Sequence, residues 1–143
     1  MINNWDKKFM DVARLIATWS KDPNRQVGCI IVDADHNQLS GGYNGFPRGV
    51  ADNDRLLNRD TKLKIIVHAE ANAVAAAGRN GHSLKGAVAY ITSNPCAQCA
   101  ALLIQAGIVR VVYIKVDRPR WVDENKLALE ILKEARVEYE ELV

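Results

Sequence analysis

Two short segments, His68-Ala69-Glu70 and Pro95-Cys96-Ala97-Gln98-Cys99, restrict the folds open to this chain more than any other feature of its sequence. Cys96 and Cys99 stand three residues apart, so a helix that begins at Cys96 would project both sulfurs from one face. One imidazole and two thiolates form a donor set that suits zinc, with a fourth position left for water. The fold must therefore bring residue 68 close to residues 96–99.

Glu70 gives the predicted metal site its chemistry. It lies two residues after His68, in an alanine-rich run from Ala69 to Ala77 that predicts a helix. A carboxylate in this place would reach a water on the metal without binding the metal itself, so it would accept a proton and pass it on. Helix N-termini favour negative charge, which helps to keep the cysteines ionised for zinc. We therefore expect a catalytic zinc site.

Two further interpretations of the cysteine pair stay open. Cys-x-x-Cys is also the pattern of a redox pair, and a structural zinc site would be closed if Cys29 were its fourth ligand. The proline before Cys96 and the His-x-Glu segment favour the catalytic site over both of these. Cys29 lies inside a predicted strand, where a free cysteine is most often a small buried hydrophobic residue.

Composition places the chain among globular domains. It has 143 residues, of which 48% are hydrophobic and 25% charged, so we expect one domain over residues 1–143. Its 19 basic and 17 acidic residues give a net charge of +2, which neither requires an anionic substrate nor favours nucleic acid as a partner. We see no secretory signal and no membrane span, and three cysteines with two assigned to a metal predict a reducing cytoplasm.

Hydrophobic periodicity predicts helices and strands in the order α-β-β-α-β-α-β-α-β. Asn3 or Asn4 would cap the first helix, which would bury an apolar face that begins with Trp5 and Phe9. Residues 44–64 contain glycine, proline and many charges, and predict an exposed loop that can include one helical turn. The predicted helices cover 4–20, 68–78, 96–106 and 123–135, and the predicted strands cover 27–32, 38–43, 87–92, 109–114 and 137–142.

This order of elements predicts an α/β fold with a mixed sheet. The first two strands would form an antiparallel hairpin, while the later strand-helix-strand units imply parallel neighbours with right-handed crossovers. The metal ligands would stand at the N-terminal ends of the two central helices, beside strand C-termini, where α/β sheets often bind ligands. His36 in a turn and His82 in a loop are expected to be exposed.

Two further segments, Ser20–Gly28 and Gly42–Gly49, complete a resemblance that covers nearly the whole chain. Together with the metal motifs, they make the sequence similar to the deoxycytidylate (dCMP) deaminases of the zinc-dependent cytidine deaminase superfamily. The resemblance implies a three-layer α-β-α cytidine-deaminase-like fold with a mixed five-stranded sheet. It also implies that the histidine and two cysteines hold one Zn²⁺ ion and that Glu70 shuttles protons.

A nucleotide substrate would need contacts for its base, sugar and phosphate. By resemblance, Asn44 corresponds to an asparagine that contacts the sugar, although Asn-Gly is also a turn signal. Trp121 is a candidate to cover the base or sugar, and the loop with Arg118 and Arg120 is our first choice for the phosphate. The predicted substrate contacts are Asn44, Ala69, Lys21, Arg25, Arg118, Arg120 and Trp121.

The segment from residue 42 to residue 48 resembles the region in which many family members bind a nucleoside triphosphate regulator. The resemblance implies a dCTP or dTTP effector, accompanied by Mg²⁺, on Gly42, Tyr43, Gly45, Phe46, Pro47 and Arg48. Small members of the family usually assemble, so it also implies a homo-oligomer, often a hexamer. Some relatives hold a second zinc ion, but residues 48–67 contain no Cys or His, which predicts a single zinc.

The predicted function is zinc-dependent hydrolytic deamination of dCMP to dUMP with release of ammonia, a reaction of pyrimidine deoxynucleotide metabolism that supplies a precursor of dTTP. A deaminase of dCTP, or of free cytidine or cytosine, would use the same chemistry, and the sequence does not count phosphates. A nucleic-acid-editing deaminase and a non-catalytic, zinc-stabilised nucleotide sensor would also fit the metal motif. The chain has no basic tail to support the editing enzyme.

Overall fold

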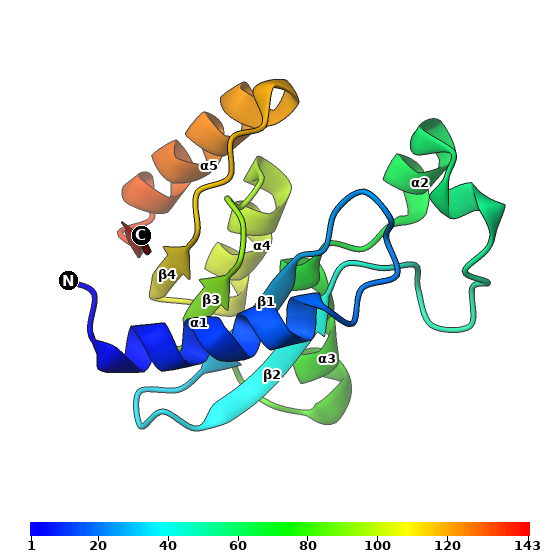
Figure 1. Ribbon diagram of the computed structural model, residues 1–143. Helices are drawn as coiled ribbons and strands as arrows, with labels where there is room; N and C mark the ends of the chain where they lie inside the picture. The colour runs from blue at the N-terminus through cyan, green and yellow to red at the C-terminus, as the bar shows by residue number, and fades with distance from the viewer.

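The computed structural model describes residues 1–143, and its centre is a five-stranded mixed sheet in the order β2-β1-β3-β4-β5 (Figure 1). β1 pairs antiparallel with both β2 and β3, whereas β3, β4 and β5 run parallel to one another. The predicted hairpin and the predicted parallel half are therefore both confirmed. The strands are β1 Gly28–Val32, β2 Gln38–Tyr43, β3 Val88–Ile91, β4 Arg110–Tyr113 and β5 Glu138–Glu141.

Helices cover both faces of this sheet. One helix, α1, crosses the face nearest the viewer in Figure 1, and the other face carries three helices, α3, α4 and α5. This arrangement confirms the predicted three-layer α-β-α fold. None of the helices is both long enough and apolar enough to span a membrane. The helices are α1 Asn4–Ala17, α2 Arg59–Ile65, α3 Ala69–Asn80, α4 Ala97–Ala106 and α5 Val122–Glu134, with 3₁₀ turns η1 Asp54–Leu56 and η2 Pro119–Trp121.

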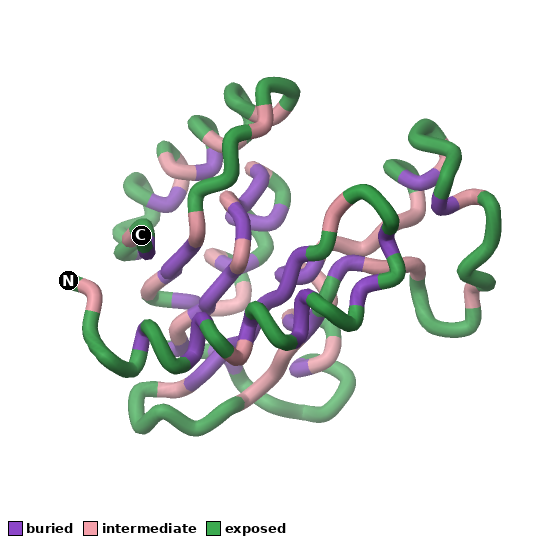
Figure 2. Tube along the Cα trace, in the orientation of Figure 1, coloured by how far each residue is buried: buried purple, intermediate pink, exposed green.

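The core lies on both sides of β1, whose five residues are all buried (Figure 2). Side chains alternate across a strand, so Cys29 and Ile31 join the cluster under α3, α4 and α5, while Ile30 and Val32 join the cluster under α1. A strand covered on both faces reads as a continuous apolar run, which is how this segment appears in the sequence. The structure thus confirms Cys29 as a core residue.

The first helix begins where it was predicted to begin, but it differs from its prediction in where it ends and in which residue it buries near its start. Asn3 caps it in a reciprocal box with Asp6, as expected of an asparagine there, but the helix ends at Ala17 instead of residue 20. Trp5 is not part of the core, because 45% of it is exposed and it stacks on the exposed His36 ring. Asp6 is buried in its place, since its carboxylate accepts hydrogen bonds from Arg110 and from the Tyr90 hydroxyl.

The loop predicted over residues 44–64 contains more regular structure than expected. The turn η1 and most of the seven-residue helix α2 lie within it, which is more than the single helical turn that the prediction allowed for. Its many charges concealed a short helix that the Asn58 side chain caps. Helix α3 also runs past Gly78 and ends at Asn80, where the capping residue Gly81 adopts the left-handed φ of 74° that a terminating glycine supplies.

Candidate metal centre and catalytic cavity

The three predicted metal ligands lie together at the N-termini of two helices. His68 is the N-cap residue of α3 and Cys96 is the N-cap residue of α4, with Cys99 one turn further along. His68 Nδ1 is 3.5 Å from the Cys96 sulfur and 3.4 Å from the Cys99 sulfur. The ligand atoms of all three residues lie within 4.8 Å of one another.

These distances fit a zinc ion. Zn–S bonds of about 2.3 Å and Zn–N bonds of about 2.0–2.1 Å at tetrahedral angles separate nitrogen from sulfur by about 3.6 Å. The observed separations of 3.5 Å and 3.4 Å are close to that length. Cys29 does not belong to this group of ligand atoms, so the structure does not support a closed site with Cys29 as the fourth ligand.

The two thiols share their protons unequally. A hydrogen bond from the Cys99 thiol, helped by the His68 imidazole, lowers the pKa of Cys96 against the opposing effect of burial. The pKa of Cys99 is raised, because its proton is held by Cys96 and because it is buried near the carboxylate of Glu70. A divalent cation between the two sulfurs would favour ionisation of both.

Glu70 lies beside these ligands in the first turn of α3. Only 4% of the residue is exposed, and it lines the same cavity as His68 and Cys96. Burial raises the pKa of the Glu70 carboxyl, although its own backbone N–H and the His68 imidazole work in the opposite direction. A buried carboxyl group with a raised pKa, placed beside the metal ligands, is suited to accept a proton and to return it, as a proton shuttle requires.

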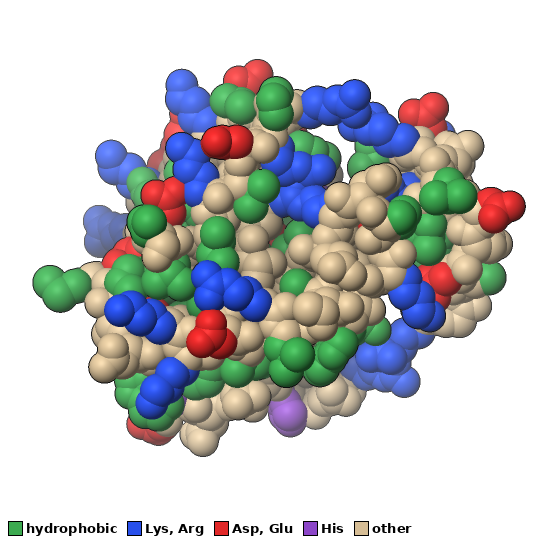
Figure 3. All heavy atoms as spheres, viewed as in Figure 1, with side chains coloured by type: hydrophobic (Ala, Val, Ile, Leu, Met, Phe, Trp, Pro, Cys, Tyr) green, Lys and Arg blue, Asp and Glu red, His purple; other side chains and the backbone are tan.

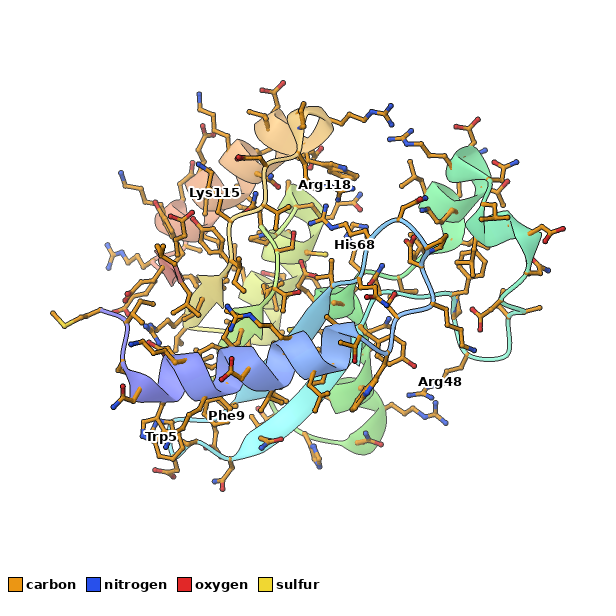
Figure 4. The ribbon with its side chains drawn as sticks, viewed as in Figure 1. Trp5, Phe9, Arg48, His68, Lys115 and Arg118 are labelled. Carbon is orange, nitrogen blue, oxygen red and sulfur yellow. The ribbon has the colours of Figure 1, made fainter.

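The metal group opens into a cavity of about 540 Å³, a size typical of small-molecule sites. Figure 3 shows Lys and Arg side chains gathered around this hollow, between the η2 end and the α2 end of the molecule. Figure 4 shows Arg118 close to His68. Of the predicted substrate contacts, the cavity brings together Arg25, Asn44, Ala69, Arg118, Arg120 and Trp121.

Trp121 forms one wall of the cavity. Its ring meets the His68 ring edge-on, with the centroids 6.3 Å apart and the planes at 74°. The Arg118 guanidinium lies 6.0 Å from the Trp121 ring centroid. Burial lowers the pKa of Arg118, while the carboxylate of Asp22 partly offsets that effect. The η2 turn therefore holds an aromatic face and a partly desolvated cation beside the metal ligands.

The Asn44 side chain has a structural role, because it forms hydrogen bonds with the segment of residues 22–27. Its side-chain carbonyl accepts a hydrogen bond from the Val27 N–H at 2.8 Å. Its amide group donates to the Arg25 carbonyl at 2.9 Å and to the Asp22 carboxylate at 3.5 Å. The side chain thus fixes residues 22–27 around the cavity that it also lines, and its contact with substrate stays a prediction.

The structure places Lys21 and the predicted effector residues outside the cavity. Lys21 is exposed and forms an ion pair with Asp52 at 3.0 Å, and it is not among the residues that line the cavity, so its contact with phosphate stays a prediction. Gly42 packs against α3, and a Cβ there would lie 2.6 Å from the Ala69 carbonyl oxygen, which accounts for the glycine without a phosphate. Gly45 forms a β-bridge with Val67. The other effector candidates, Tyr43, Phe46, Pro47 and Arg48, also do not line the cavity.

Two basic residues that sequence reasoning missed line the cavity from α2. Arg59 and Lys62 stand three residues apart, so both reach the cavity from one face of this helix. The sequence did contain a signal for this helix face: two basic residues three positions apart, shortly after Asn58, which is a residue type that often caps helices. It was hidden because the surrounding run has no apolar stripe and reads as a loop.

One histidine and two cysteines at paired helix N-termini, with a buried glutamate two residues after the histidine, define the zinc-dependent nucleobase deaminases. Within that class, residues 3–115 match the family described as the cytidine and deoxycytidylate deaminase zinc-binding region, and the chain belongs to this family. The resemblance drawn from the sequence is confirmed.

Several relatives support this assignment. The human deoxycytidylate deaminase is 37% identical over 145 residues, covering 97% of this chain and 80% of the human protein. An uncharacterized deaminase of Aliivibrio fischeri is 37% identical over 142 residues, covering 96% of this chain and 93% of its own. The dCMP deaminase of cyanophage S-TIM5, solved in complex with dCMP and dUMP, superposes with a TM-score of 0.85 at 27% identity and 99% coverage of both chains.

Proposed function

We propose that this protein deaminates dCMP to dUMP and releases ammonia. The observation that carries the proposal is a set of arginines without carboxylate partners in the cavity that holds the metal ligands and Glu70. None of these arginines forms an ion pair with an acidic side chain, so the cavity offers its positive charge to an anionic ligand. The arginines are Arg25, Arg59, Arg118 and Arg120.

The relatives support the same substrate. Curated relatives at 37% identity are named deoxycytidylate deaminases, and the cyanophage structure contains dCMP and dUMP. Four arginines around the cavity fit a phosphorylated substrate better than free cytidine, because guanidinium groups match the charge and geometry of a phosphate.

The reaction replaces the amino group of cytosine with a carbonyl oxygen from water. Zinc, held by the His68, Cys96 and Cys99 side chains, would lower the pKa of water enough to supply a nucleophile near neutral pH. Glu70 accepts the proton released from that water and delivers it to N3 of the ring, which makes C4 electrophilic. The oxygen of that water adds to C4. Glu70 then takes the remaining proton from the new C4 hydroxyl group and delivers it to the amino group, so that the C4–N bond breaks, ammonia leaves and the C4 carbonyl forms.

The other cavity residues would orient the nucleotide for this chemistry. Trp121 would cover the base or sugar, and Asn44 and the backbone of Ala69 would contact the sugar and base. Arg118 and Arg120 remain our first choice for the 5′-phosphate, because both line the cavity that contains His68 and Cys96. Regulation by dCTP or dTTP with Mg²⁺, assembly into a homo-oligomer such as a hexamer, and a cytoplasmic location are supported by the family resemblance alone.

The proposal is tested by ammonia release from deoxycytidine, dCMP and dCTP at equal concentration. We expect kcat/KM for dCMP to exceed that for deoxycytidine by at least about a hundredfold, since more than one charge-assisted contact to the phosphate is lost with the nucleoside. Preference for dCTP, or for deoxycytidine, would contradict the substrate assignment.

Two further outcomes would point to a different kind of protein. Zinc retained without ammonia release from any cytosine compound would favour a nucleotide sensor. Activity on single-stranded DNA or tRNA, with steep salt dependence and none on dCMP, would favour a nucleic-acid-editing enzyme.

A further inference from the structure

The wall of the cavity opposite η2 is formed by α2, which stands apart from the sheet in Figure 1. The chain around it, residues 46–66, contains no strand of the sheet. Its backbone link to the body is the bridge between Gly45 and Val67. Arg59, Lys62 and Leu63 of this helix nevertheless line the cavity, so something else must hold α2 in place over it.

A buried ion pair makes that connection. Lys62 Nζ lies 3.2 Å from the Asp22 carboxylate, and the two side chains are only 9% and 5% exposed. Asp22 is itself fixed, because its carboxylate accepts hydrogen bonds from the Asn24 N–H at 2.9 Å and from the Asn44 amide at 3.5 Å. The pair thus ties α2 to residues 22–27, the segment that carries Arg25.

A gain in folding stability does not explain why this buried ion pair is present. Desolvation of two charges offsets most of their attraction, so a buried ion pair adds little to stability compared with apolar residues of similar size. Its effect on geometry is larger, because Lys62 Nζ is held against a carboxylate that is itself fixed by hydrogen bonds. Arg59 is one helical turn before Lys62, on the same side of α2.

We propose that Lys62 and Asp22 are positioning residues, whose ion pair holds α2 so that Arg59 faces the phosphate of the substrate. The pair also neutralises Asp22, a carboxylate in the cavity that would otherwise repel a phosphate. This inference rests on the proposed action on a nucleotide. The ion pair would thereby contribute to selectivity for the nucleotide over the nucleoside, since deoxycytidine has no phosphate for Arg59 to bind.

The test uses the full-length, zinc-loaded protein and four variants: Lys62→Met, the double variant Lys62→Met with Asp22→Asn, Arg59→Ala, and the triple combination. We expect Lys62→Met and the double variant to raise KM for dCMP about tenfold or more, with kcat changed less than about threefold, as for the loss of one charged contact to phosphate. The kcat/KM for deoxycytidine should fall much less than the kcat/KM for dCMP, because the nucleoside carries no phosphate for Arg59 to contact. Lys64→Met, an exposed lysine on the same helix, is the matched control and should behave as wild type.

Arg59→Ala tells positioning from a general structural role. If Lys62 acts through Arg59, the double change at Lys62 and Asp22 should add less than about twofold to KM once Arg59 is absent. The proposal is overturned if the effects of Arg59→Ala and of the double change on KM are fully additive. It is also overturned if the double variant has an unchanged KM for dCMP, or if kcat/KM falls equally for dCMP and for deoxycytidine.

Binding gives a readout that does not depend on turnover. The Kd of dUMP, measured by calorimetry, should rise in the same ratio as KM in the double variant, which carries no uncompensated charge and is therefore expected to fold. A wild-type protein that prefers deoxycytidine would instead remove the proposed function, and that result is visible before any variant is compared.

Discussion

Glu70 is the residue on which the proposed chemistry depends. It is the carboxylate buried against the metal ligands, and it must act twice in each turnover. We predict that Glu70→Gln lowers kcat for dCMP more than about a thousandfold, because general acid-base transfer of this kind contributes roughly 10²- to 10⁴-fold per step. Ammonia release measures the loss, and metal analysis should still find one zinc per chain.

Retention of zinc separates a lost proton shuttle from a damaged metal site, since Glu70 is not among the ligands. Near-normal turnover by Glu70→Gln would remove the residue from its role. The same metal analysis on His68→Ala should show zinc lost, which provides the contrast.

Single residues were predictable where the chemistry is carried by neighbours in the sequence. The His-x-Glu and Cys-x-x-Cys segments need only a helix start to place their side chains, and the structure provides one for each. Basic residues were less predictable, because a lysine on the surface and a lysine in a cavity look alike in sequence. Lys21 was chosen and lies outside, whereas Lys62 was passed over and is buried against Asp22.

At the scale of elements, the seating of α3 on β2 decides where His68 lies. Gly42 permits that close approach, since a Cβ there would lie 2.6 Å from both the Ala69 oxygen and the Ala73 nitrogen. We predict that Gly42→Ala lowers the free energy of unfolding by roughly 1–3 kcal/mol or more, as overpacking against a rigid backbone does. It should also weaken zinc binding, because α3 must shift. Chemical denaturation and metal titration measure the two effects.

Gly78→Ala is the matched control on the same helix. A Cβ at Gly78 meets nothing within 4 Å, and the residue lies inside α3. Alanine there should raise the free energy of unfolding by about 0.5–1 kcal/mol, because glycine loses more conformational freedom in a helix. If both variants shifted stability in the same direction, the close approach at Gly42 would not be the cause.

Elements with a clear apolar period were predicted to within a few residues, and the exceptions have physical causes. α2 was missed because a seven-residue helix held by a cap and an ion pair leaves no hydrophobic stripe. The end of α3 was predicted too early, because a glycine that faces open space does not stop a helix. The terminating residue is the one with a positive φ.

Across the whole molecule, a polar cluster joins the N-terminal helix to the parallel strands. The Asp6 side chain is fully buried and accepts hydrogen bonds from Arg110 at 2.7 Å and 2.9 Å, and Arg110 also contacts Glu140. Burial would raise the pKa of Asp6, but the hydrogen bonds from Arg110, the Asn3 backbone and Tyr90 together hold it below its usual value.

We predict that this cluster makes stability fall in acid. The folded-state pKa of Asp6 is below the ordinary value of 3.8, so its contribution is complete above about pH 5 and is lost as the pH falls through the lowered pKa. Asp6→Asn should cost about 3–5 kcal/mol at pH 7, since it leaves Arg110 without its buried partner, and should flatten the acid decline. Denaturant titrations from about pH 7 to about pH 3 measure both effects.

Asp35→Asn provides the control, because Asp35 is exposed in a turn and forms no ion pair. Its unfolding curve should follow that of the wild type at every pH. An Asp6→Asn curve with the same acid slope as wild type would show that other carboxylates set the decline.

The position of β1 has a consequence for how the protein is made. Residue 29 of β1 pairs with residue 42 of β2 on one side and with residue 91 of β3 on the other. Because β3 leaves the ribosome much later than β1 and β2, the pairing of β1 with β3 forms late in synthesis. Until β3 has paired with β1, one edge of β1 is unpaired, and the sheet does not yet hold His68 close to Cys96 and Cys99. Capture of the metal must therefore come near the end of synthesis, after the two halves of the sheet have joined.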